Sequence, residues 1–176
     1  VELATCRRLT TDALSAARDL LRRADVLVLT LGTDRYYRLP DGRLVANCHK
    51  QPAAAFTEHA ADVETLTSDL RCALDGLRAL RPELQVVWTV SPYRYAKYGL
   101  HASQLAKARL LLTVDALCAT DERSVYFPAY ELLLDELRDY RYYARDLLHP
   151  SDTAVELIGE RFADWCFAPA LHTFAR

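Results

Sequence analysis

The spacing of apolar and polar positions divides the chain into alternating strands and helices. Two short runs, Val26–Leu31 and residues 84–90, are apolar on both faces, as expected for strands of a parallel sheet covered on both sides. A third short strand is predicted at residues 125–127. Apolar residues at helical spacing predict a helix capped by Thr10-Thr11-Asp12, one from about Val63 to Pro82, one around residues 105–117, one at residues 131–137 and one around residues 155–165.

A turn signal interrupts this pattern soon after the first strand. Pro40-Asp41-Gly42 separates the segments 36–39 and 43–46, which predicts a small inserted hairpin. Its returning arm leads into the polar hexapeptide Asn47-Cys48-His49-Lys50-Gln51-Pro52.

Strands that alternate with helices are typical of a doubly wound α/β domain, and 176 residues suit one such domain, spanning 1–176. In this fold, ligands bind outside the carboxyl ends of the parallel strands. Three polar stretches follow strands here: Gly32-Thr33-Asp34, Ser91-Pro92-Tyr93-Arg94, and the loop that contains Asp146 and His149. We therefore expect them to converge on one crevice.

The last stretch, Asp146-Leu147-Leu148-His149-Pro150-Ser151, has the spacing of a catalytic base and its orienting acid. A carboxylate three residues before a histidine can bind one ring nitrogen and leave the other free to move a proton. The alternative is that Asp146 is a turn residue, His149 lies on the surface and Pro150-Ser151 begins an ordinary helix. Convergence with the other two stretches favours the catalytic interpretation.

Composition limits the partners and the setting. With 22 basic and 24 acidic residues, the net charge of −2 offers no footprint for nucleic acid or an anionic membrane and favours a neutral or small substrate. No apolar run reaches the roughly 18 residues of a membrane span. The five cysteines are scattered, which favours a reducing, cytoplasmic setting. The spacing of Cys48, His49, Asp146 and His149 matches no usual zinc site, so neither a metal nor another cofactor is expected.

Seven short blocks between about Asp25 and the last helix carry a family resemblance. They are Leu29-Thr30-Leu31-Gly32-Thr33, Asn47-Cys48-His49-Lys50-Gln51-Pro52, Thr89-Val90-Ser91-Pro92, Lys107-Ala108-Arg109, Phe127-Pro128-Ala129-Tyr130-Glu131, Asp135-Glu136-Leu137-Arg138-Asp139-Tyr140-Arg141 and Asp146-Leu147-Leu148-His149-Pro150-Ser151. Together they resemble the GSCFA family, which is related to the SGNH (GDSL-like) hydrolases.

The resemblance implies a flavodoxin-like, three-layer αβα fold with a parallel sheet, and a serine nucleophile in a Gly-Ser-Cys-Phe-Ala motif after the first strand. That motif is absent here, as is any methionine, so the first strands, the nucleophile and one oxyanion donor are expected upstream of Val1. Residues 1–176 alone are then expected to be inactive. The strand Val26–Leu31 would have a bare edge, open to self-association.

The implied activity is that of an SGNH-like serine esterase or O-acyltransferase, with His149 as base and Asp146 as orienter. Its substrate would be a small-molecule or saccharide ester, such as an O-acetyl group on a sugar. A non-catalytic binding or structural domain that keeps the fold is the alternative.

The oxyanion hole is expected to depart from the wider SGNH pattern. Gly32 and Thr33 match the start of the block that supplies an asparagine in those enzymes, but Asp34 follows, and an ionised carboxylate can only accept a hydrogen bond. Asn47 is then the nearest amide, with His49 as a second donor. Alternatively, Asn47 caps a turn and His49 only lines the pocket.

Other polar residues are given lesser roles. Ser91 ends a strand, but Pro92 lacks the backbone N–H that an oxyanion hole often takes from the residue after the nucleophile, so Ser91 is interpreted as a turn residue at the site. Cys48 beside His49 is a poor nucleophile and base pair, because adjacent side chains rarely face each other. Arg94 lies among tyrosines, which could bind a sugar or acyl group or simply pack against the arginine stem.

Overall fold

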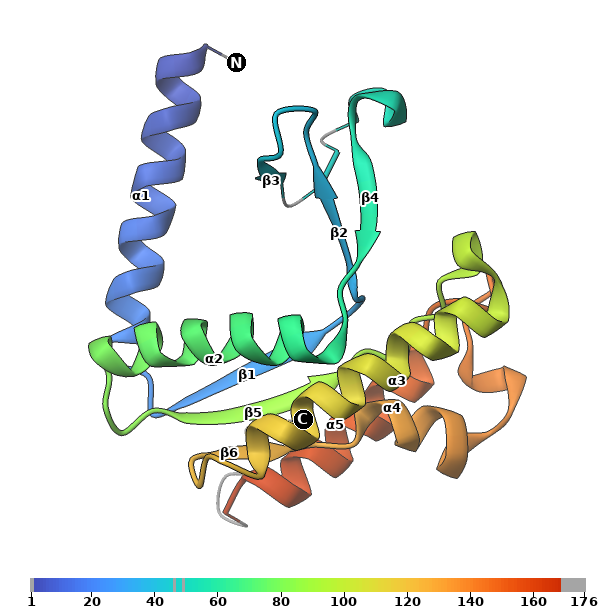
Figure 1. The fold of residues 1–176 in the computed structure, drawn as a ribbon. Coiled ribbons are helices and arrows are strands. Elements are labelled where there is room, and N and C mark those ends of the chain that lie inside the picture. Colours follow the sequence, from blue (N-terminus) through green and yellow to red (C-terminus); the bar gives the residue numbers. More distant parts are fainter. Residues whose placement is uncertain (1, 46, 49, 169–176) are drawn as a thin grey trace.

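The computed structural model describes residues 2–45, 47–48 and 50–168. Its centre is a parallel sheet in the order β1–β5–β6, formed by β1 (Val26–Leu31), β5 (Gln85–Val90) and β6 (Ser124–Tyr126) (Figure 1). β1 and β5 pair along their whole length, so their carboxyl ends lie at the same edge of the sheet. All three strands predicted for the parallel sheet are therefore present.

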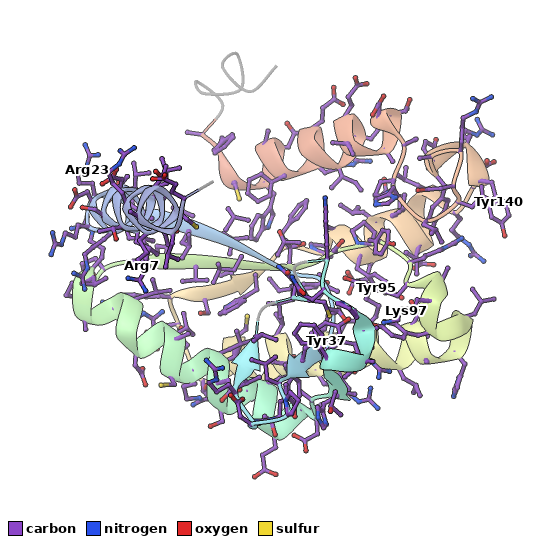
Figure 2. All side chains as sticks on the ribbon, turned by 90° about the horizontal axis from the view of Figure 1, so that it is seen from above. Arg7, Arg23, Tyr37, Tyr95, Lys97 and Tyr140 are labelled. Atoms are coloured by element: carbon purple, nitrogen blue, oxygen red, sulfur yellow. The ribbon has the colours of Figure 1, made fainter. Side chains whose placement is uncertain are left out.

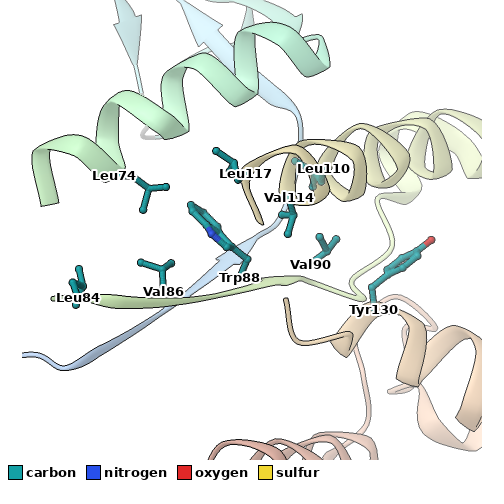
Figure 3. Packing of buried hydrophobic residues seen from close by; sticks show 9 residues of the cluster. All are labelled: Leu74, Leu84, Val86, Trp88, Val90, Leu110, Val114, Leu117 and Tyr130. Carbon is teal, nitrogen blue, oxygen red and sulfur yellow. The ribbon is translucent and has the colours of Figure 1, made fainter. Parts of the chain in front are cut away.

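Helices cover both faces of this sheet. α2 (Val63–Leu80) and α3 (Gly99–Cys118) pack on one face, and α5 (Asp152–Cys166) lies on the other (Figures 1 and 3). The helix predicted at 131–137 consists of one turn, α4 (Ala129–Glu131), continued by the π-helical η3 (Leu132–Leu137). Short 3₁₀ turns complete the chain: η1 (Ala53–Ala55), η2 (Ala96–Tyr98) and η4 (Tyr140–Tyr142). The predicted three-layer α/β fold is confirmed.

The main core lies between β5 and the helices α2 and α3. Trp88 is its largest side chain, and its indole N–H donates to the Ser124 hydroxyl at 3.2 Å. Around it pack buried side chains from α2, β5 and α3 (Figure 3): Leu74, Val86, Val90, Leu110, Val114 and Leu117. On this face the side chains of β5 are buried, and those of β1 are partly buried.

The predicted hairpin is part of a second sheet, which stands away from the first (Figure 1). β2 (Arg35–Arg38) pairs antiparallel with β3 (Leu44–Val45), and a strand that was not predicted, β4 (Thr57–Ala60), pairs with the other edge of β2. The backbone N–H of Ala61 donates to the Asp34 carbonyl at 2.9 Å, so the chain leaves this sheet where it entered.

An ion pair anchors the small sheet to η2, the turn just before α3. The Lys97 ammonium lies 2.6 Å from the Glu58 carboxylate and over the ring of Tyr37, 5.9 Å from its centroid. Figure 2 shows Tyr37, Tyr95 and Lys97 gathered in this region, with Tyr140 on a separate flank. Desolvation, with hydrogen bonds to Glu58 and Tyr37, raises the pKa of Tyr98, so this phenol stays protonated.

The first helix differs from its prediction. α1 spans Leu3–Leu21, so Thr10-Thr11-Asp12 lies inside the helix, and the Thr10 hydroxyl donates to the Cys6 carbonyl one turn earlier. The predicted cap was wrong because no glycine or proline precedes Thr10 to stop the helix from extending towards Glu2. None of its residues is buried. Within the described residues, no helix is both long and apolar enough to cross a membrane.

β1 forms one edge of the main sheet. Among the described strands only β5 pairs with it, and Val26 and Val28 remain 54% and 45% exposed on the side that faces away from α2. The edge is thus bare within the described part of the chain, as predicted.

Candidate functional site

Asp146 and His149 form a hydrogen-bonded pair immediately before α5. One carboxylate oxygen of Asp146 accepts from the backbone N–H groups of Leu148, at 2.9 Å, and His149, at 3.0 Å. The other oxygen lies 2.5 Å from Nδ1 of His149. The local turn therefore aims the carboxylate at the imidazole, and the catalytic role of the pair stays a prediction.

The charge of Asp146 is well stabilised. The backbone N–H groups of His149 and Leu148, followed by the His149 ring, lower the pKa of the carboxyl group to about 2. An ionised carboxylate at Nδ1 favours the tautomer that carries its proton there, which leaves Nε2 as the basic nitrogen. The His149 side chain is 60% exposed, so this nitrogen can reach a partner.

The loop after β5 contacts this pair. The ring of Tyr93 lies 4.4 Å from the His149 ring, and the Arg94 backbone N–H donates to the Leu148 carbonyl at 3.1 Å. Tyr93 also packs edge-on against Tyr95, with 4.7 Å between ring centroids. These contacts place the polar stretch after β5 beside the catalytic candidates.

The turn after β1 joins the same region through Tyr95. The Tyr95 hydroxyl is hydrogen-bonded to the side chain of Thr33, and it lies 3.3 Å from where a Cβ on Gly32 would stand. A larger residue at position 32 would therefore press on Tyr95. The three polar stretches that follow the strands are thus brought together, as the sequence predicted.

Ser91, Thr33 and Arg94 each have a structural partner. The Ser91 hydroxyl accepts from the Tyr93 backbone N–H at 3.3 Å, and the Thr33 hydroxyl accepts from the Arg35 backbone N–H at 3.1 Å. The Arg94 guanidinium stacks 3.8 Å from the centroid of the Tyr143 ring. Ser91 therefore lies in a turn, as interpreted from the sequence, and substrate binding by Ser91, Thr33 and Arg94 stays a prediction.

The two predicted oxyanion donors lie beyond β3. Asn47 is exposed in the segment that follows that strand, and His49 lies outside the described residues. The structure does not test their role, which stays a prediction.

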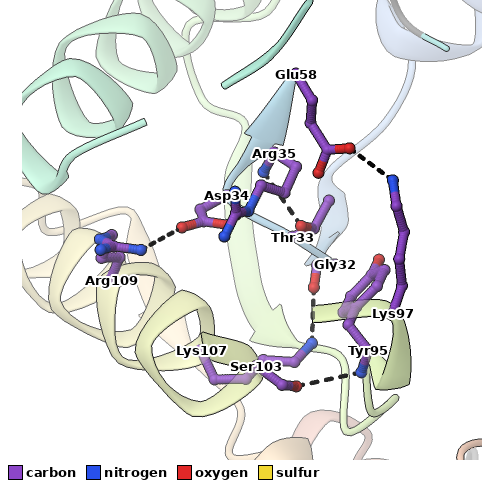
Figure 4. A network of polar contacts seen from close by, with 10 residues as sticks. All are labelled: Gly32, Thr33, Asp34, Arg35, Glu58, Tyr95, Lys97, Ser103, Lys107 and Arg109. Atoms are coloured by element: carbon purple, nitrogen blue, oxygen red, sulfur yellow. Dashed lines mark hydrogen bonds and ion pairs between the residues drawn. The ribbon is translucent and has the colours of Figure 1, made fainter. Parts of the chain in front are cut away.

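A buried polar network beneath the β1 turn was not predicted (Figure 4). The Asp34 side chain is inaccessible to solvent, with one oxygen 2.6 Å from the Arg109 guanidinium and the other 3.3 Å from Nε of Arg35. The Asp34 side chain therefore pairs with two arginines inside the protein, away from any bound substrate.

Lys107 completes this network. It is only 2% exposed, and its ammonium donates to the Gly32 carbonyl at 2.7 Å. Burial lowers the pKa of Lys107 to about 8, although the charge of Asp34 opposes the shift. Nearby, the Ser103 hydroxyl accepts from the Tyr95 backbone N–H at 3.2 Å. α3 thus fixes both the turn after β1 and the loop after β5. In the sequence, a lysine and an arginine two positions apart in an apolar helix could have indicated this buried network.

Within the described residues, no three histidine, cysteine or acidic side chains cluster as metal ligands would.

Comparison with known proteins gives a family for the chain. No curated protein matches the sequence. The model of the GSCFA family matches residues 2–162, which is most of the chain, and the protein therefore belongs to the GSCFA family.

Proposed function

We propose that this domain takes part in serine-dependent ester hydrolysis or O-acyl transfer of the SGNH type, with His149 as base and Asp146 as its orienter. The main support is that the Asp146 carboxylate makes three hydrogen bonds, two with backbone N–H groups and one with Nδ1 of His149. A surface turn needs only the backbone contacts. The short bond to the ring is what a catalytic base requires.

The reaction would proceed in two steps. Nε2 of His149 removes the proton of a serine hydroxyl while the serine oxygen attacks the ester carbonyl. The imidazolium, stabilised by Asp146, then protonates the leaving alcohol as the carbon–oxygen bond breaks, which leaves an acyl-serine. Water or a sugar hydroxyl, deprotonated by His149, attacks this ester and releases the acid or the acylated sugar. The serine would come from the Gly-Ser-Cys-Phe-Ala motif that the family resemblance implies, outside residues 1–176.

The developing oxyanion needs hydrogen-bond donors. Asn47 is our candidate for the side-chain donor, with His49 as a second one. The turn at Gly32 and Thr33 would form the adjacent wall, since Lys107 and Tyr95 hold it in place.

A fluorophosphonate probe on the full-length protein tests this proposal, because only an activated serine is phosphonylated rapidly. We expect labelling of one serine in the wild type and its loss in His149→Ala. His101→Ala is the matched control, since His101 is an exposed histidine on α3 and should leave labelling unchanged. Absence of labelling in the folded wild type would instead support the non-catalytic binding domain.

A further inference from the structure

An apolar cavity of about 320 Å³ lies on the α5 side of the main sheet. Its walls come from β1, from β5 and the loop after it, from the segment after β6, and from α5; they include Val28, Thr89, Pro92, Phe127, Pro150 and Phe162. This volume is at the lower end of the range of small-molecule pockets, about 300–1,000 Å³.

The cavity lies near the catalytic candidates, because two of the residues that line it are neighbours in the chain of His149 and Tyr93. Pro150 follows His149 in the chain, and Pro92 precedes Tyr93, whose ring lies 4.4 Å from the His149 ring. The cavity therefore lies in the neighbourhood of the point at which His149 would act.

One polar atom in the wall lacks a partner. Thr89 is 6% exposed, and its hydroxyl has no hydrogen-bond partner among the described residues. Because side chains alternate along β5, Trp88 and Val90 enter the main core while Thr89 faces the cavity. A buried hydroxyl without a partner is uncommon in folded proteins, and Thr89 is the one polar side chain in an otherwise apolar lining.

The chemistry of the walls selects the ligand. None of the residues that line the cavity is ionisable, and Thr89 carries the only side-chain hydroxyl. A sugar would lose most of its hydrogen bonds in such a site, whereas a hydrocarbon chain would lose none. We propose that the cavity binds the apolar acyl chain of the ester substrate, so that the acyl group is longer than acetyl. This inference rests on the proposed function.

The first test uses the full-length protein and p-nitrophenyl esters from acetate to octanoate. Each methylene buried in the cavity should raise kcat/KM about fourfold until the cavity is full. Gly159 of α5 lines the cavity, and a Cβ there would meet no atom within 4 Å, so Gly159→Leu fills the space without a backbone clash. It should lower kcat/KM for hexanoate about tenfold or more and leave acetate nearly unchanged.

Gly76→Leu is the matched control. Gly76 lies in α2, also has open space around its Cβ position, and is not among the cavity residues. Both variants gain the same helix propensity, so a difference between them reports the cavity. Equal rates for all chain lengths, or an unchanged hexanoate rate in Gly159→Leu, would overturn the inference and leave the proposed esterase activity intact.

A binding measurement separates the two proposals. A fluorescent fatty acid should bind the full-length protein saturably, more weakly in Gly159→Leu and unchanged in Gly76→Leu. Such binding without hydrolysis of any ester would refute the proposed function and keep the cavity as an apolar binding site. Binding to residues 1–176 but not to the full-length protein would overturn the inference, because another segment would then occupy the cavity.

Discussion

The buried Lys107 gives the domain a stability that should depend on pH in a specific way. Burial lowers the pKa of this ammonium from its usual 10.5 to about 8. Between these values the unfolded chain binds a proton that folded Lys107 releases, so the free energy of unfolding should rise with pH across the window. At about 1.4 kcal/mol per pKa unit the full rise is at most about 3.5 kcal/mol, and water entering the site would reduce it.

Urea unfolding of the wild type and of Lys107→Met, at about pH 7.5 and about pH 9.5, measures this effect. Burial also raises the pKa of the Cys118 and Cys166 thiols, which gives a slope of opposite sign in the same range. Both proteins contain these thiols, so their contribution cancels when the free energy of unfolding of Lys107→Met is subtracted from that of the wild type. Between the two pH values, this difference should change by about 2 kcal/mol in favour of the wild type.

Lys97→Met is the control for a lysine at the surface. The hydrogen bond to Glu58 raises the pKa of Lys97, so its stabilisation persists below the usual lysine pKa and is lost only at higher pH. The difference in unfolding free energy between Lys97→Met and the wild type should therefore stay constant between the two pH values. A pH-independent difference for Lys107→Met as well would refute the account of a desolvated ammonium.

Four further predictions concern the site and the sheet edge. Asp146→Asn in the full-length protein should lower ester turnover by up to about 10⁴ through the wrong His149 tautomer, and wild-type turnover would contradict the pairing. Asn47→Ala should lower kcat by about 10² with an unchanged circular dichroism spectrum; no change in rate would remove Asn47 from the oxyanion hole. Arg109→Met leaves the buried Asp34 carboxylate with Arg35 alone, at a cost of about 2–4 kcal/mol, and should lower Tm by roughly 5–15 °C in thermal scans. Residues 1–176 should self-associate through the exposed edge strand β1, and light scattering should show a shift towards monomer in Val28→Lys. A monomeric wild type would refute this contact.

The elements predicted correctly are those whose own side chains form the core. α2 and β5 carry an apolar pattern that only burial explains, and both begin and end close to their predicted positions. β4 was missed because Thr57-Glu58-His59-Ala60 has no apolar alternation. It forms because β2 offers a second edge and because His59 stacks on Tyr36, with 5.3 Å between ring centroids. Such a strand depends on partners rather than on its own sequence.

The same distinction applies to the site. Asp146 and His149 lie three residues apart, so a local turn suffices to join them, and the spacing alone predicted their hydrogen bond. Lys107 and Gly32 are 75 residues apart, and only the packing of α3 against the end of β1 brings them together. A charged residue in an apolar helix indicates that a buried partner exists but does not identify it.

The hydrogen bond between Ala61 and the Asp34 carbonyl has a consequence for how this domain can vary. Residues 35–60 leave and rejoin the α/β framework at one point, so their ends remain together whatever lies between them. Closing a loop of a different length costs little extra free energy, and insertions are best tolerated where they leave the core undisturbed. A protein engineer could therefore change the length of the turn between β2 and β3, outside the segment that carries Asn47 and His49, while β1, α2 and the Asp146–His149 pair keep their geometry. Relatives of this chain would be expected to differ more in the turn between β2 and β3 than in the block from Asn47 to Pro52, so that new contacts could evolve in that turn without rebuilding the catalytic framework.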